Sequence, residues 1–124
     1  LVYNYSYLYF VIVLPNPIHF YFSGKNNRFN KHDDLVIYRI IMELTNNIVK
    51  HSHATEATIQ IIYHEKQMTL MVEDNGKGIT QETLPGIGLK NVVARVHFLN
   101  GTLNVDSGNK GTTLMIQIPF KENQ

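Results

Sequence analysis

Cysteine is absent from this 124-residue chain. Without a thiol there is no cysteine nucleophile, no thiolate metal site and no disulfide-stapled secreted scaffold. Net charge is also small, because eleven Lys and Arg residues against ten Asp and Glu residues leave only +1. We therefore expect no bulk attraction to nucleic acid or to a membrane surface. Any site for a phosphate group must come from a local arrangement of side chains and backbone.

Long apolar runs are missing as well. The first 24 residues carry no Asp, Glu, Lys or Arg, but a transmembrane helix needs about 20 apolar residues, and this run is interrupted by polar residues and Pro15. A secretory signal would begin with positive charge, which is absent here. Tyrosine at every second position from Tyr3 to Tyr9 predicts a strand. Because the chain begins with Leu, we expect residues 1–17 to be an N-terminal extension or the remnant of an upstream segment.

The remaining sequence has the composition of one globular domain, with 44% hydrophobic and 17% charged residues. Its periodicity predicts an order of strand, helix, hairpin, helix, hairpin. Asp33 or Asp34 is expected to cap the first helix, and Asn100–Gly101 to end the second in a left-handed conformation. This order favours an α+β fold, a two-layer sandwich in which helices cover one face of a mixed, mostly antiparallel sheet. The strands are predicted at 18–22, 56–64, 67–73, 102–106 and 112–120, and the helices at 33–51 and 89–99.

The first predicted helix has a polar side with two possible interpretations. At 100° per residue, the predicted core side carries Leu35, Tyr38, Ile41, Met42, Ile48 and Val49. The opposite side, within about a third of the circumference, carries Arg39, Glu43, Asn46, Asn47 and Lys50. This side is either a solvated helix face or a site for magnesium and phosphate. In the second interpretation Asn47 supplies an oxygen to the metal, Glu43 holds a water or accepts a proton, and Lys50 meets a phosphate.

Two glycine-bearing segments are equally open to two interpretations. Asp74-Asn75-Gly76-Lys77-Gly78 follows a buried strand, and it is either a turn or a site that reads a base. In such a site Asp74 accepts a hydrogen bond from an exocyclic amine, and Gly76 lets a flat ring approach the backbone. Gly86-Ile87-Gly88-Leu89 opens the second helix, where free amides can bind a phosphate. Neither a Walker loop nor the three-glycine dinucleotide fingerprint is present.

Taken together and in order, these motifs resemble the N, G1 and G2 boxes of the GHKL (Bergerat-fold) ATPases. The chain is most similar to the ATP-binding catalytic domain of sensor histidine kinases, in the nitrate-sensor-like subclass with a short lid, since only 79–85 separates the glycine segments. The resemblance covers about 18–120 and implies a Bergerat-fold catalytic domain at 18–124. The motifs that carry it are Glu43-x-x-x-Asn47-x-x-Lys50-His51, Asp74-x-Gly76-x-Gly78, Gly86-x-Gly88-Leu89 and Gly111-Thr112-Thr113.

The resemblance implies that the domain binds ATP together with magnesium. Asn47 would ligate the metal, and Glu43 would polarise the attacking group as a base or an orienter. Lys50, with help from His51, would contact phosphate. Asp74 would accept from the adenine amino group, and Thr112 would join it through a bound water. The other implied ATP-binding positions are Gly76, Gly78, Gly86, Gly88 and Leu89.

The implied activity is that of a protein histidine kinase in two-component signal transduction. The domain would donate the γ-phosphoryl group to a histidine on a separate dimerisation domain, serve a response regulator and lie in the cytoplasm. Little turnover is expected from the chain by itself, because the phosphoacceptor domain is not visible in it. Its scattered histidines suit surface or core positions and have no metal-site spacing. The alternatives are a serine kinase of the anti-sigma-factor type from the same superfamily and a non-catalytic nucleotide-binding interaction module.

Overall fold

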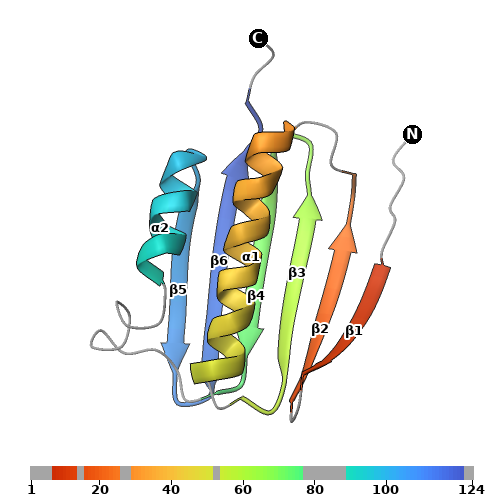
Figure 1. Cartoon of the computed structure of the whole chain (residues 1–124), viewed down its shortest axis with the longest axis vertical. Coiled ribbons are helices and arrows are strands. Elements are labelled where there is room, and N and C mark those ends of the chain that lie inside the picture. Colours follow the sequence, from red (N-terminus) through yellow and green to blue (C-terminus); the bar gives the residue numbers. More distant parts are fainter. Residues whose placement is uncertain (1–6, 14–15, 26–28, 52–53, 77–88, 122–124) are drawn as a thin grey trace.

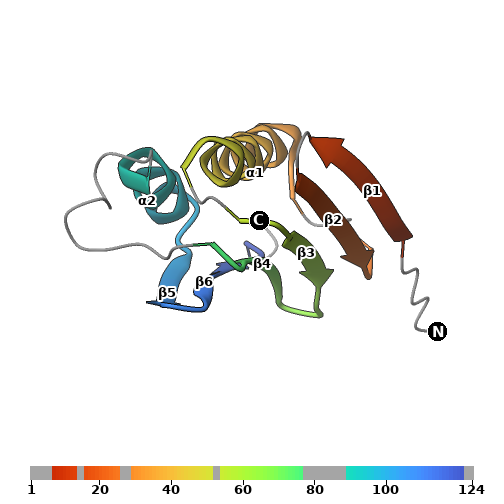
Figure 2. The ribbon, with the colours of Figure 1, turned by 90° about the horizontal axis from the view of Figure 1, so that it is seen from below.

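In the described part of the chain, six strands form one mixed sheet, and two helices cover one of its faces (Figures 1 and 2). The computed structural model describes residues 7–13, 16–25, 29–51, 54–76 and 89–121, with the backbone alone for 7–13, 16, 17 and 51. The elements are β1 (Tyr7–Val13), β2 (Asn16–Ser23), α1 (Lys31–His51), β3 (Ala57–Tyr63), β4 (Gln67–Asp74), α2 (Leu89–Phe98), β5 (Thr102–Gly108) and β6 (Gly111–Pro119).

The strands lie in the order β1-β2-β3-β4-β6-β5. Only β2 and β3 are parallel, and the other neighbours are antiparallel. The helix α1 connects the parallel pair, as a parallel crossover requires. The predicted α+β fold, with a mostly antiparallel sheet and helices on one face, is confirmed. Of the strand predicted from Tyr3 to Tyr9, residues 7–9 belong to β1, which pairs with β2 at the sheet edge, and residues 3–6 lie outside the described residues.

Alternation along the central strands builds the core. On β6 every second residue from Thr112 to Ile118 is buried, and the intervening residues are half-buried. The side chains of Ile59, Leu70 and Ile116 on three neighbouring strands have no exposed surface. Because successive side chains of a strand point to opposite faces, this buried set forms one apolar layer beneath the two helices.

The core side of α1 differs from the predicted one. The buried residues are Ile37, Ile40, Leu44 and Ile48, which recur at i, i+3, i+7 and i+11 and so share one face. Of the predicted core residues only Ile48 is buried and Ile41 half-buried, whereas the other four are exposed. The prediction was wrong because α1 carries apolar residues on most of its circumference, so periodicity alone does not select the side that meets the sheet. The four exposed residues are Leu35, Tyr38, Met42 and Val49.

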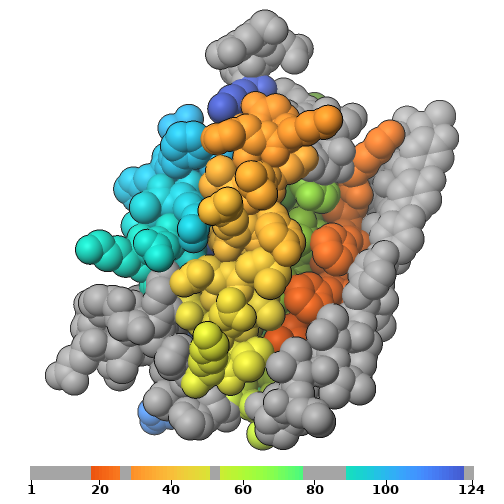
Figure 3. Space-filling view, viewed as in Figure 1, coloured from red at the N-terminus to blue at the C-terminus, as the bar shows by residue number. Residues whose placement is uncertain are grey.

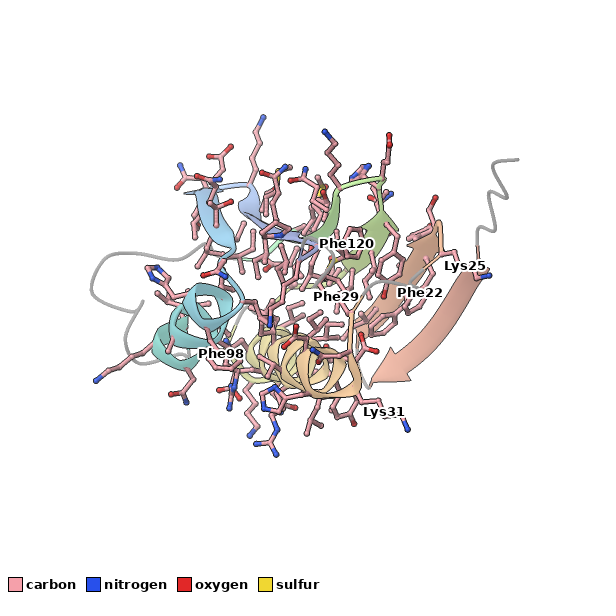
Figure 4. All side chains as sticks on the ribbon, turned by 90° about the horizontal axis from the view of Figure 1, so that it is seen from above. Phe22, Lys25, Phe29, Lys31, Phe98 and Phe120 are labelled. Atoms are coloured by element: carbon pink, nitrogen blue, oxygen red, sulfur yellow. The ribbon has the colours of Figure 1, made fainter. Side chains whose placement is uncertain are left out.

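The start of α1 was also predicted incorrectly. Asn30 is the cap, since its Oδ1 accepts a hydrogen bond of 2.7 Å from the N–H of Asp33. Asp33 lies in the first turn, where it is buried, and its Oδ2 is 3.3 Å from Nζ of Lys121 beyond β6. The rings of Phe29 and Phe120 meet nearby, with centroids 4.7 Å apart (Figure 4). These contacts join the beginning of α1 to the end of the last strand.

The end of α2 confirms the predicted left-handed cap. Asn100 has a φ of 58°, and the N–H of Gly101 donates to the carbonyl of Val96 over 2.9 Å, as in a Schellman motif. The second hairpin is longer than predicted, since β5 continues to Gly108 and β6 begins at Gly111. In the part of the chain that the structure describes, neither helix combines the length and the apolar character needed to span a membrane.

Truncation of Ile40 tests the side of α1 that packs on the sheet. Ile40→Ala leaves a cavity in the core, and we expect the free energy of unfolding to fall by about 2–5 kcal/mol. The matched change Met42→Ala removes an exposed side chain and should cost no more than about 0.5 kcal/mol. Chemical denaturation monitored by circular dichroism measures both values. A larger loss of unfolding free energy for Met42→Ala than for Ile40→Ala would show that Met42 lies on the buried side of α1.

Candidate functional site

Of the sequence-predicted site residues that the structure describes, Asp74 and Thr112 lie at one end of the sheet, the lower end in Figure 1. At this end β4 ends at Asp74, β5 ends and β6 begins. The second half of α1 lies in front of the sheet toward the same end in Figure 1. Asp74 lies opposite Ala57 of β3 on one side and Thr112 of β6 on the other, and Thr112 lies opposite Ser107 of β5. These four residues form a row across four strands on the face that the helices cover.

Asp74 is a half-buried carboxylate with one oxygen already engaged. Its Oδ1 accepts a hydrogen bond of 2.8 Å from the N–H of Gly76. Within the described residues no hydrogen bond engages Oδ2. Burial raises the pKa of Asp74, and the Gly76 N–H offsets this rise in part. The carboxyl group is thus held in place by one oxygen while the other can accept a hydrogen bond from a ligand.

Thr112 completes the polar end of the row. It is 3% exposed, and its Oγ1 lies 2.9 Å from Oγ of Ser107. The preceding residue, Gly111, has a φ of 131°, and a Cβ at this position would overlap the carbonyl oxygen of Asp74. Only glycine therefore lets β6 begin close enough to Asp74 to complete the row. The role of Ser107 does not follow from the sequence, because its pairing with Thr112 depends on the register of the hairpin.

Asn75 is a second residue that the sequence analysis missed. Its Oδ1 accepts from the N–H groups of Thr55 and Glu56, over 2.9 and 3.0 Å, and its Nδ2 donates to Oγ1 of Thr55 over 2.8 Å. The segment that leaves α1 is thereby held against the end of β4. The only sequence signal was the tendency of Asn to bond backbone groups in turns, which does not reveal a partner 20 residues away.

The polar residues of α1 lie on its α2 side. Glu43 and Asn47 follow Val36 by seven and eleven residues, so the three share one side of the helix, and Val36 lines a groove with residues of α2. Glu43 and Asn47 are half-buried, whereas Lys50 is exposed. Nδ2 of Asn47 is buried and has no hydrogen-bond partner among the described residues. A buried polar atom of this kind is costly unless a ligand satisfies it.

These donors suit magnesium. The cation takes oxygen ligands from one or two side chains together with water and phosphate oxygens, and Asn47 and Glu43 carry an amide oxygen and a carboxylate one helical turn apart. The amide can present either its nitrogen or its oxygen by rotation about one bond. No cluster of three or more metal-ligating His, Asp or Glu side chains occurs in the described ranges.

Some predicted positions lie outside the described residues. These are Gly78, Gly86, Gly88 and the side chain of His51. Leu89 is the first residue of α2, and its side chain is 3% exposed and belongs to the core. A groove of about 700 Å³ lies at the strand ends, and Asp74 and Thr112 are among the residues that line it. Neither Glu43 nor Asn47 lines this groove.

Residues 32–122 match the family of histidine kinase-, DNA gyrase B- and HSP90-like ATPases. The chain belongs to this family. The resemblance stated from the motifs is thus confirmed, and Asp74, Thr112 and Asn47 all lie within the matched region.

Among the similar proteins are sensor kinases and solved kinase domains. The signal transduction histidine-protein kinase/phosphatase DegS of Brevibacillus brevis is 33% identical over 100 residues, which cover 78% of this chain and 26% of DegS. The oxygen sensor histidine kinase NreB of Staphylococcus carnosus is 26% identical over 109 residues, 85% of this chain and 31% of NreB. The chain thus spans less than a third of these relatives. The histidine kinase domain of the Erythrobacter litoralis EL346 blue-light activated histidine kinase is 27% identical, with a TM-score of 0.60 over 71% of this chain and 45% of that one.

The raised pKa of Asp74 predicts a pH-dependent stability difference. In the unfolded chain this carboxyl group titrates near its ordinary value of about 3.9, so between that pH and its higher folded pKa the folded state binds more protons. The contribution of Asp74 to stability therefore decreases as pH rises through this window. We expect Asp74→Asn, which keeps the acceptor for Gly76, to be at least as stable as wild type at pH 7. The stability difference between Asp74→Asn and wild type should decrease as pH falls toward 4. Thermal unfolding of both proteins without ligand measures this difference. A difference that increases on acidification would contradict a raised pKa of Asp74.

Proposed function

We propose that residues 18–124 are the ATP-binding catalytic domain of a sensor histidine kinase. The domain would bind Mg-ATP and donate the γ-phosphoryl group to a histidine on a separate dimerisation domain. One observation carries the proposal: Asp74 and Thr112 on the sheet lie at the same end of the molecule as Asn47 on α1. The family assignment and the similarity to sensor histidine kinases support it.

The sheet end would bind the adenine ring. Oδ2 of Asp74 would accept a hydrogen bond from the exocyclic amine, which is a donor. Gly76 is buried beside it and presents no side chain to the ring. The paired hydroxyls of Ser107 and Thr112 would hold a water between Asp74 and the base. Because Asp74 is half-buried, its hydrogen bond to the ligand would form in an environment that is partly shielded from water, where such bonds are stronger.

The half-buried side of α1 would bind the triphosphate. Magnesium, when bound, supplies positive charge that neutralises the phosphate oxygens. Asn47 would provide its amide oxygen as a ligand to the metal, after rotation of the amide that turns this oxygen to the position of the buried nitrogen. Glu43, one turn away, would orient or deprotonate the attacking group, and exposed Lys50 would contact a phosphate as a point charge. Phosphoryl transfer needs mainly such positioning and electrostatic stabilisation.

The partners of the domain follow from the same proposal. The phosphoacceptor domain would receive the phosphoryl group, a response regulator would receive it next, and the reaction would take place in the cytoplasm. The 124-residue chain should therefore bind nucleotide and turn it over slowly. Rapid stoichiometric autophosphorylation of this chain would contradict the proposal that the phosphoacceptor histidine lies on a separate domain.

Calorimetric titration with a non-hydrolysable ATP analogue and magnesium tests the adenine contact. In Asp74→Asn an amide can place a donor against the donor of adenine, which costs about 1–3 kcal/mol, or roughly 5- to 150-fold in affinity. Asp106→Asn removes the same charge from an exposed position on β5 and should leave the affinity unchanged. Absence of binding by folded wild-type protein, or equal losses in both variants, would reject the proposed site.

The same titration with and without magnesium tests Asn47. Asn47→Ala removes the proposed metal ligand while leaving the adenine site intact. We expect its affinity in magnesium to fall to the level that wild type shows in EDTA, and its affinity in EDTA to match wild type. A variant that loses affinity equally under both conditions would indicate a structural role for Asn47.

A further inference from the structure

A second groove lies between the beginning of α1 and the end of α2. The two helices run antiparallel beside each other (Figures 1 and 3), and the groove has a volume of about 420 Å³. Glu43 and Asn47 do not line it, because they lie further along α1 toward the other end of the sheet. The groove is therefore separate from the proposed nucleotide site.

Large apolar side chains line this groove and are not covered. Leu35 of α1 is 49% exposed and Phe98 of α2 is 59% exposed. Phe98 lies on α2 beside the start of α1 (Figure 4), and its ring centroid is 5.7 Å from that of His32. Ala94, one turn before Phe98, adds a small side chain to the same wall. Exposed apolar surface that is concave and bordered by polar groups is typical of a binding groove.

The charges that line the groove are all positive. Arg39 lies on the α1 wall and Arg95 on the α2 wall, and none of the described residues that line the groove is Asp or Glu. Nη1 of Arg95 is buried and has no hydrogen-bond partner in the described part of the chain. Among the described residues, neither Arg39 nor Arg95 forms an ion pair. A buried polar nitrogen is normally hydrogen-bonded, and a carboxylate matches the geometry of the half-buried guanidinium that carries it.

We propose that this groove binds an amphipathic α-helix whose apolar stripe is flanked by Asp or Glu. Leucine-sized side chains would cover Leu35 and Phe98, while carboxylates would pair with Arg39 and Arg95. A helix fits because two antiparallel helices leave between them a furrow in which a third helix packs by ridges into grooves. Recognition of an amphipathic helix through apolar anchors at i, i+3, i+4 and i+7 is a recurrent binding mode.

Two labelled helical peptides test the proposal with the 124-residue chain. The first has leucine at every third or fourth position and glutamate on both flanks of that stripe, and the second has lysine in place of each glutamate. By fluorescence anisotropy at low salt, we expect saturable binding of the glutamate peptide that is about tenfold or more tighter than binding of the lysine peptide. This preference should decrease as salt is added, because exposed ion pairs are screened.

Variants locate the binding to the groove. Arg39→Ala combined with Arg95→Ala should remove the preference for glutamate, and Phe98→Ala should weaken binding of both peptides. Lys110→Ala removes an exposed positive charge from the β5–β6 turn and serves as the matched control. Circular dichroism confirms that each variant is folded, and the ATP analogue should not displace the glutamate peptide.

Three results would overturn the proposal. The first is the absence of saturable binding or of any preference between the peptides. The second is a loss in Lys110→Ala as large as that in the double arginine variant, which would indicate general charge attraction. The third is a dimer in sedimentation velocity that the glutamate peptide does not dissociate and that Phe98→Ala does dissociate, since the occupant of the groove would then be a second copy of the chain.

Discussion

The antiparallel pairing of β4 with β6 places Asp74 opposite Thr112, and the geometry of the candidate site depends on this register. A slip of β6 by one residue against β4 would turn Thr112 to the other face of the sheet, away from Asp74 and from the helices. The register is strongly specified, because the same alternation buries Leu70 against Ile116. Core packing and site geometry are therefore set by one constraint. The register also requires Gly111, since a side chain at this position would overlap the backbone carbonyl of Asp74.

The helix α1 combines two roles on neighbouring sides of one cylinder. Leu44 and Ile48 pack on the sheet, while Glu43 and Asn47 lie at the edge of that contact and are half-buried. Half-burial gives these polar groups a fixed position and partial shielding from water, both of which strengthen electrostatic interactions with a ligand. It also leaves the amide of Asn47 unsatisfied among the described residues. Such a group reduces the stability of the free protein and suits a site whose binding partner supplies the missing bond.

Features that depend on residues close in sequence were predicted better than contacts between residues far apart in sequence. Strands and helices were placed nearly correctly, and Asn100 was correctly assigned to the end of α2, because these features depend on residues close in sequence. The cap of α1 was assigned to Asp33 or Asp34 instead of Asn30, since all three residues are good capping types. The roles of Ser107 and Asn75 were missed. Their hydrogen bonds connect elements that only the folded sheet brings together.

The sequence by itself determined the kind and order of the elements, the family, and the identities of the motif residues that belong to it. These follow from local periodicity and from the spacing of residues with distinctive chemistry. Only the tertiary structure decided which side of α1 is buried, and with it the exposure of Leu35 and the presence of Arg39 and Arg95 on the walls of one groove. The physical reason is that the rotation of a helix with apolar residues on most sides is selected by the shape of the sheet and of its neighbouring helix. That shape is a property of distant segments packed together.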